Sequence, residues 1–131
     1  MAKFYTAGYS GHTVEQLIQA ADSLGACVID IRLRANSRMP QWRGYGLGKA
    51  LGINRYSHVF SLGNPGAFDD GTMRLADEAI GIRHVEELTA SRPAILLCGC
   101  RDPGICHRSM VANKLRDRGH EVVELEWPKP E

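Results

Sequence analysis

The sequence predicts an α/β protein: a three-layer, doubly wound domain in which helices cover both faces of a mostly parallel sheet of about five strands. Two observations lead to this prediction. Short apolar or alternating runs typical of strands recur along the chain, and segments with helical periodicity separate them. Right-handed crossovers between parallel strands leave few other topologies. At 131 residues, the chain is expected to form a single domain over residues 1–131.

The first part of the chain predicts two strands with a helix between them. Residues 3–7 are typical of a strand that ends at a Gly-Tyr-Ser-Gly turn. Thr13 and Gln16 have the spacing of a capping box, and Gly25 is suited to end that helix in the left-handed conformation. Residues 26–31 then form a short apolar run, which indicates a buried strand.

The middle of the chain is richer in turn residues. Apolar residues return at helical intervals only after position 72, where Gly81 favours a break in the helix. The expected elements are a loop at 33–46, a short helix at 47–51, a strand at 55–60, a loop at 62–71 and a helix at 72–90.

The last part of the chain predicts a strand, a polar loop, a helix and a final strand. The apolar run 94–97 indicates a buried strand, and the loop 98–105 follows it. A helix is expected from about residue 106 to Gly119, which is suited to a left-handed cap. Residues 121–125 form the last expected strand.

Polar residues are concentrated just after the expected strands. In a parallel sheet, ligands bind beyond the carboxyl ends of the strands, so these residues are expected to converge on one pocket. The helix that begins near Cys106 would add unpaired N–H groups and the positive end of its dipole, and both favour an anion. The converging segments are residues 6–10, 30–38, 62–64 and 98–108.

The charge of the chain is unevenly distributed. The stretch 31–68 carries six basic residues and no acidic residue, so the remainder carries −5 against a whole-chain charge of +1. This asymmetry indicates an anionic partner, either a small anionic substrate or nucleic acid. Trp42 and Tyr45 offer aromatic faces on which a base could stack. The alternatives are a solvated basic loop and aromatic rings that cover the core.

Four residues near the strand ends are candidate anion ligands: Ser10, Arg32, Arg38 and Arg108. Arg108 falls in the first turn of its helix, where a guanidinium can hold a phosphate or carboxylate through two hydrogen bonds. The alternative for Arg108 is a structural ion pair with Asp30 or Asp102.

Asp30, His107 and Cys106 are the candidate catalytic residues. Asp30 and Arg32 stand two residues apart at a strand end, so their side chains share one side. Asp30 could serve as a general base, orient an arginine or bind a ribose hydroxyl. His107 is a candidate acid or base near neutral pH, with a hydrogen bond to a backbone carbonyl as the alternative.

Three cysteines, Cys98, Cys100 and Cys106, surround the same loop. As zinc ligands they would join His107, but the usual two-residue gap between paired cysteines is missing. Cys100 or Cys106 could instead act as a nucleophile, although neither has the spacing to arginine found in cysteine phosphatases. The remaining interpretation is a structural role, which is also expected for Cys27 in its strand.

The sequence contains no apolar run of the roughly 18 residues that a membrane span requires. Residues 1–5 run directly into strand-like sequence and lack the core of a signal peptide. We therefore expect no membrane partner and a cytoplasmic location, in which the cysteines are thiols or metal ligands rather than disulfides.

These motifs together resemble a bacterial family of small uncharacterised proteins, the domain of unknown function numbered 488. The resemblance covers nearly the whole chain and implies an α/β fold with a shared pocket. Relatives often carry histidine where Tyr9 stands here, and glutamate where Cys100 stands. The matching segments are Thr6–Ser10, Asp30–Arg32, Ser37-Arg38 with Trp42, Leu62-Gly63, Leu97-Cys98, Asp102-Pro103 and Cys106–Arg108.

The sequence therefore leads to one main functional hypothesis and two alternatives. The main hypothesis is an enzyme that acts on a phosphorylated or nucleotide-like substrate in an anion-binding pocket. The first alternative is a nucleic-acid-binding module that uses the basic loop 32–55, and the second is a thiol or metal sensor. The sequence names no cofactor.

Overall fold

The computed structural model describes residues 2–99 and 106–130. Within these ranges, five strands form one sheet with the order β3-β2-β4-β1-β5, and every strand pair is parallel. The predicted α/β class is therefore confirmed. The strands are β1 (Lys3–Gly8), β2 (Cys27–Asp30), β3 (Tyr56–His58), β4 (Ala94–Cys98) and β5 (Glu121–Glu124); the α-helices are α1 (Val14–Leu24), α2 (Gly44–Leu51), α3 (Glu78–Leu88) and α4 (Arg108–Asp117).

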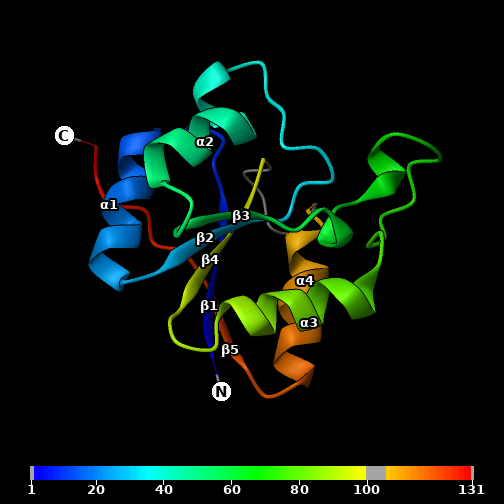
Figure 1. Cartoon of the computed structure of the whole chain (residues 1–131). Coiled ribbons are helices and arrows are strands. Elements are labelled where there is room, and N and C mark those ends of the chain that lie inside the picture. The colour runs from blue at the N-terminus through cyan, green and yellow to red at the C-terminus, as the bar shows by residue number, and fades with distance from the viewer. Residues whose placement is uncertain (1, 100–105, 131) are drawn as a thin grey trace.

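The sheet lies between two layers of helices, with α1 and α2 on one face and α3 and α4 on the other (Figure 1). Alternate residues of the strands point to opposite faces of the sheet and belong to two separate hydrophobic clusters. Val28 packs with the residues of α1 and α2, whereas Ile29 packs with those of α3 and α4. None of the helices in the described ranges has the length and apolar character needed to span a membrane.

The predicted ends of two helices are present. Thr13 Oγ1 accepts from the backbone N–H of Gln16 at 3.1 Å, and the Gln16 side chain accepts from the backbone N–H of Thr13 at 2.9 Å. This is the expected capping box of α1. Gly25 ends that helix with φ +62°, and Gly119 follows α4 with φ +90°. Both conformations are strained for any residue with a Cβ.

The helix expected at residues 72–90 is shorter, because α3 begins at Glu78. The Asp77 side chain caps α3, while the backbone N–H groups of Ala76 and Asp77 donate to carbonyls of Gly63 and Ser61. These bonds hold the segment before α3 outside the helix.

Gly81 does not break α3. A Cβ at this position would lie 2.5 Å from a methyl carbon of Leu62, so glycine is what allows the helix to pack closely there. The bounds of two other helices also differ. The helix α2 begins at Gly44, three residues before the expected start, and α4 spans Arg108–Asp117 within the helix expected from about residue 106 to Gly119.

The carboxylate of Glu86 in α3 connects this helix to the end of α4. It accepts two hydrogen bonds from Arg118, at 2.7 and 2.8 Å, and one from His120 Nε2 at 2.6 Å. These donors lower the pKa of Glu86 from 4.5 to about 2. A lowered carboxyl pKa stabilises the fold above the unfolded value, and this contribution is lost as pH falls through the folded value.

We expect Glu86→Gln to lower the free energy of unfolding by about 1 kcal/mol at neutral pH, as for a partly exposed ion pair. Urea unfolding measured across pH should show the difference from wild type shrinking between pH 4.5 and about 2. The matched control is Glu87→Gln, an exposed neighbour in the same helix. A difference that stays constant down to pH 2 would contradict the assignment.

Candidate active site

A cavity of about 290 Å³ lies at the carboxyl ends of the parallel strands. Tyr9 follows β1, Arg32 follows β2, and Gly99 follows β4. Cys106 and His107, directly before α4, also line the cavity. Segments that are distant in sequence therefore converge on this edge of the sheet, as the parallel arrangement predicts.

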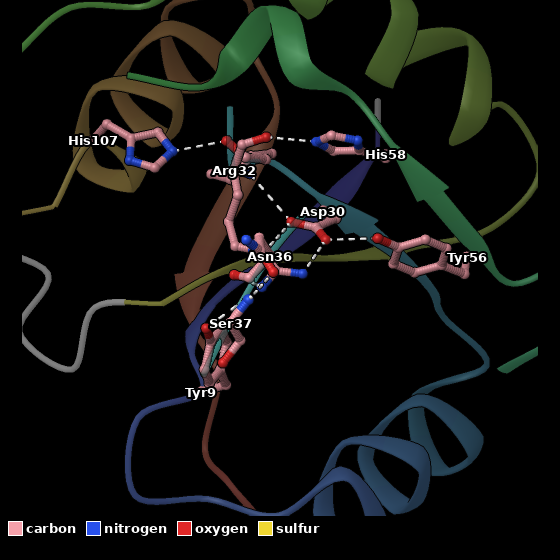
Figure 2. Close-up of polar contacts among 9 residues, drawn as sticks. Tyr9, Asp30, Arg32, Asn36, Ser37, Tyr56, His58 and His107 are labelled. Atoms are coloured by element: carbon pink, nitrogen blue, oxygen red, sulfur yellow. Dashed lines mark hydrogen bonds and ion pairs between the residues drawn. The ribbon is translucent and has the colours of Figure 1, made fainter. Parts of the chain in front are cut away.

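Asp30 and Arg32 form a buried ion pair beside this cavity (Figure 2). Arg32 Nε donates to Asp30 Oδ1 at 2.8 Å, and Arg32 Nη2 donates to Asp30 Oδ2 at 2.6 Å. The phenol of Tyr56 donates to the same Oδ2 at 2.6 Å. Both carboxylate oxygens are thus occupied, and Asp30 is fully buried. Of the three interpretations of Asp30, this geometry favours the orientation of an arginine.

Tyr56 is held in its donor form by its surroundings. Burial and the adjacent Asp30 carboxylate raise the pKa of Tyr56 above its usual value, because both disfavour a phenolate. The phenol therefore keeps its proton at neutral pH and remains a donor to Asp30. The parallel register explains this contact. Tyr56 in β3 pairs with Val28 in β2, and Asp30 lies two residues after Val28, on the same side of that strand.

The guanidinium of Arg32 also organises the chain that follows β2. Its Nη1 donates to the backbone carbonyl of Asn36 at 3.0 Å and lies 3.4 Å from the hydroxyl of Tyr9. The ring of Tyr9 stacks on Trp42, with centroids 4.4 Å apart. Trp42 is 1% exposed, so it serves the core and has no face on which a base could stack. Tyr45, by contrast, is 81% exposed.

Two histidines complete the hydrogen bonding where β2 ends. His107 Nε2 donates to the carbonyl of Ile31 at 2.8 Å, and His58 Nε2 donates to the carbonyl of Arg32 at 2.6 Å (Figure 2). A carbonyl oxygen only accepts, so each Nε2 carries a proton. In neutral His107 the lone pair is therefore on Nδ1, which lies 3.9 Å from Cys106 Sγ. His107 thus makes the expected hydrogen bond to a backbone carbonyl through Nε2, and its basic Nδ1 faces the thiol of Cys106.

The thiols lie on the α3 and α4 side of the sheet. Cys98 Sγ and Cys106 Sγ are 3.0 Å apart, and both side chains are buried. Arg108 Nη1 donates to Cys98 Sγ at 3.2 Å, while Nη2 pairs with Glu124 at 2.8 Å. Among the described residues, Arg108 therefore forms its ion pair with Glu124 and not with Asp30, whereas Asp102, the other expected partner, lies outside the described residues. In the described part of the chain, no group of three or more potential ligands could hold a metal ion.

The predicted site residues do not all lie together. Arg32, Cys106 and His107 line the cavity. Arg38 lines a second cavity, of about 470 Å³, that shares Arg34, Asn36 and Phe68 with the first.

Asp30 and Arg108 are buried behind the cavities, on opposite faces of the sheet. Of the described residues near the end of β1, Tyr9 rather than Ser10 lines the cavity, and Ser10 is half-buried in the following turn. Two predictions concern Cys100 and Asp102, which lie outside the described residues.

Sequence reasoning missed Tyr56, His58 and Phe68 as members of the site. Tyr56 and His58 stand two apart in a strand, the same spacing that drew attention to Asp30 and Arg32. This spacing places Tyr56 and His58 on one side of their strand, but their contacts with the segment of Asp30 and Arg32 could be predicted only by knowing that β3 lies beside β2 in the sheet. Phe68 lies in a loop after η3 (Pro65–Ala67), and no periodic pattern marks it.

We expect Asp30→Ala to destabilise the protein strongly, because it leaves the buried guanidinium of Arg32 without its carboxylate. The expected loss is about 3–5 kcal/mol in urea unfolding, as for other broken buried pairs. Asp22→Ala removes the exposed partner of Arg55 and should cost no more than about 1 kcal/mol. If Asp30→Ala does not fold, Tyr56→Phe provides a milder test, with an expected loss of about 1–3 kcal/mol. Losses no larger than the Asp22 control would show that the pair does not support the fold.

The sequence was compared with known families, curated proteins and solved structures. The model of a family described as "Domain of unknown function DUF488" matches residues 13–115. No curated protein and no solved structure gives a significant match. The matched range includes β2, β4, the start of α4 and the residues between them, which contribute most of the cavity lining. The chain belongs to the DUF488 family.

Proposed function

We propose that the protein is an enzyme that binds a small phosphorylated or nucleotide-like anion at the carboxyl ends of its strands. One observation carries the proposal. The described residues that line the two adjoining cavities include four arginines and no carboxylate. These arginines are Arg32, Arg34, Arg38 and Arg43.

The arginines have different tasks in this proposal. Arg32 is neutralised by Asp30, so it contributes orientation and shape more than net charge. Arg34, Arg38 and Arg43 are exposed and supply the positive field that attracts an anion. Their guanidinium groups match the geometry of phosphate oxygens.

Phe68 offers a surface for the uncharged part of the ligand. The Arg34 guanidinium carbon lies 4.2 Å from the centroid of its ring, and 55% of Phe68 is exposed. A cation over an aromatic ring forms a flat platform on which a nucleobase stacks well. Each cavity is of a size suited to a small ligand or part of one.

Cys106 and His107 supply the reactive groups. The Nδ1 lone pair of His107 faces Cys106 Sγ across 3.9 Å, and a modest approach would let it take the thiol proton. The start of α4, one residue beyond His107, favours the resulting negative charge. In this assignment Cys106 is the nucleophile and His107 is the base.

The nucleic-acid alternative has less support. Its two proposed stacking residues were Trp42 and Tyr45, and Trp42 is buried against Tyr9. The exposed arginines would still favour a polyanion, so an oligonucleotide belongs in the binding test. Binding that requires the oligonucleotide and falls steeply with salt would favour this alternative.

Ligand binding is tested by thermal shift with sugar phosphates and ribonucleoside monophosphates, with the matching sugars and nucleosides as uncharged controls. We expect at least one phosphorylated compound to raise the Tm of the wild type. For that compound, Arg34→Ala should raise the Kd about tenfold or more, as expected for loss of a charged hydrogen bond. Arg83→Ala, an exposed arginine on α3, is the matched control and should bind as the wild type does. Equal binding by both variants, or no stabilisation of the wild type, would contradict the proposal.

Turnover is tested on the compounds that bind. Mass spectrometry of the incubated ligand should show conversion by the wild type and at least about a hundredfold loss of rate in His107→Gln, the size expected for a lost general base. Cys106→Ser should lose activity while keeping the affinity for the ligand, since the arginines remain. A Cys106→Ser variant that converts the ligand at the wild-type rate would exclude Cys106 as the nucleophile.

A further inference from the structure

Cys98 and Cys106 form a closely spaced pair of thiols. Cys98 is the last residue of β4, and Cys106 lies two residues before α4. Their sulfur atoms are 3.0 Å apart. A disulfide bond is about 2.0 Å long, so a displacement of about one ångström would join them.

The two thiols have different surroundings. Cys106 is one of the residues that line the cavity of about 290 Å³, and 2% of it is exposed. Cys98 has no exposed surface and is in contact with Arg108, whose Nη1 lies 3.2 Å from its sulfur. Glu124 holds the other end of the guanidinium at 2.8 Å and keeps Arg108 in this orientation. A positive charge at this distance favours the thiolate form of Cys98.

We propose that Cys106 and Cys98 are a redox pair, which a small hydroperoxide oxidises to a disulfide and a thiol reductant restores. Cys106 is the thiol that the peroxide reaches, and Cys98 is the thiol that resolves the oxidised intermediate. The proposal uses the cavity as the entry route and does not depend on the anionic substrate.

The first step is attack of the Cys106 thiolate on the outer oxygen of the hydroperoxide. A sulfur–oxygen bond forms, the oxygen–oxygen bond breaks, and the inner oxygen leaves as an alcohol after taking a proton. His107, with Nδ1 3.9 Å from this sulfur, accepts the thiol proton and returns it to the leaving oxygen. With hydrogen peroxide, the product that leaves is water.

The second step joins the two sulfurs. The Cys98 thiolate attacks the sulfur of the Cys106 sulfenic acid, the sulfur–oxygen bond breaks, and hydroxide leaves and becomes water. Overall, two thiols lose two electrons and two protons, and the peroxide becomes an alcohol and water. A small dithiol reverses the disulfide by exchange and is itself oxidised.

The test uses the full-length protein with Cys100→Ser, because Cys100 would otherwise share a tryptic peptide with Cys98. Trypsin cuts after Arg101 and Arg108, so Cys98 falls in peptide 84–101 and Cys106 in peptide 102–108. The reduced, folded protein is treated with hydrogen peroxide, the peroxide is removed with catalase, and the protein is unfolded in an alkylating reagent before digestion. We expect a linked peptide that is two hydrogens lighter than the sum of its parts and that dithiothreitol separates.

Two comparisons make the result specific. Cys27 is buried in β2, away from the cavity lining, and should remain alkylated as a thiol in the same sample. The link should form at least about tenfold faster in the folded protein than in urea, because the fold holds the thiols together. Equal rates in the two states, or peroxide treatment that leaves both peptides alkylated, would overturn the proposal.

Two variants in the Cys100→Ser background separate the roles of the thiols. With Cys98→Ala, peroxide should leave a sulfenic acid on Cys106 that dimedone traps, and no linked peptide should form. With Cys106→Ala, dimedone should label Cys98 at least about tenfold less, because Cys98 lacks access to the cavity. Circular dichroism of each reduced variant confirms folding. Dimedone labelling of Cys98 at the rate found for Cys106 would overturn the assignment of the attacking thiol, even if a disulfide forms in the parent.

Discussion

The ion pair between Asp30 and Arg32 is the interaction on which the edge of the sheet depends. A fully buried carboxylate is costly unless its oxygens are satisfied, and Asp30 accepts hydrogen bonds from the side chain and backbone of Arg32 and from Tyr56. The same guanidinium reaches Asn36 and Tyr9. The pair therefore connects β2 to its neighbour β3, to Tyr9 after β1 and to Asn36 in the segment that follows β2.

In residues 2–99 and 106–130, each face of the sheet has one buried arginine with a carboxylate partner. Arg32 pairs with Asp30 on the α1 and α2 side, and Arg108 pairs with Glu124 on the α3 and α4 side. Their charges are largely balanced within the protein. The uncompensated positive charge at the cavities therefore comes from exposed side chains, which are the ones that a diffusing anion meets first.

Much of the fold could be predicted from the sequence because its strands and caps are local features. Apolar runs and the Thr13 capping box fix the elements, and the rule for parallel sheets then gives the edge where polar residues meet. Within the helix expected at residues 72–90, Leu75 stands at helical intervals from the apolar residues that follow, and this spacing was misleading. Hydrogen bonds from the following residues to Ser61 and Gly63 keep this segment out of α3, and these contacts depend on tertiary structure.

The site was predictable only where its residues are close in sequence. The two-residue spacing of Asp30 and Arg32 correctly placed them on one side. Neither the contact of Tyr56 with Asp30 nor that of Cys98 with Cys106 follows from spacing. The first depends on which strands are neighbours, and the second joins the end of β4 to the residues just before α4, eight positions later in the sequence. The burial of Trp42 likewise depends on its packing against Tyr9.

His107 contacts both the segment of the Asp30–Arg32 ion pair and Cys106. Its Nε2 is bound to the carbonyl of Ile31, which lies between Asp30 and Arg32, and its Nδ1 faces Cys106. The hydrogen bond to Ile31 fixes the tautomer, because a carbonyl cannot donate. The backbone between Asp30 and Arg32 therefore sets the position and the tautomer of His107 beside Cys106. Ile31, whose carbonyl binds His107, therefore links the segment of the Asp30–Arg32 ion pair to the histidine that follows Cys106.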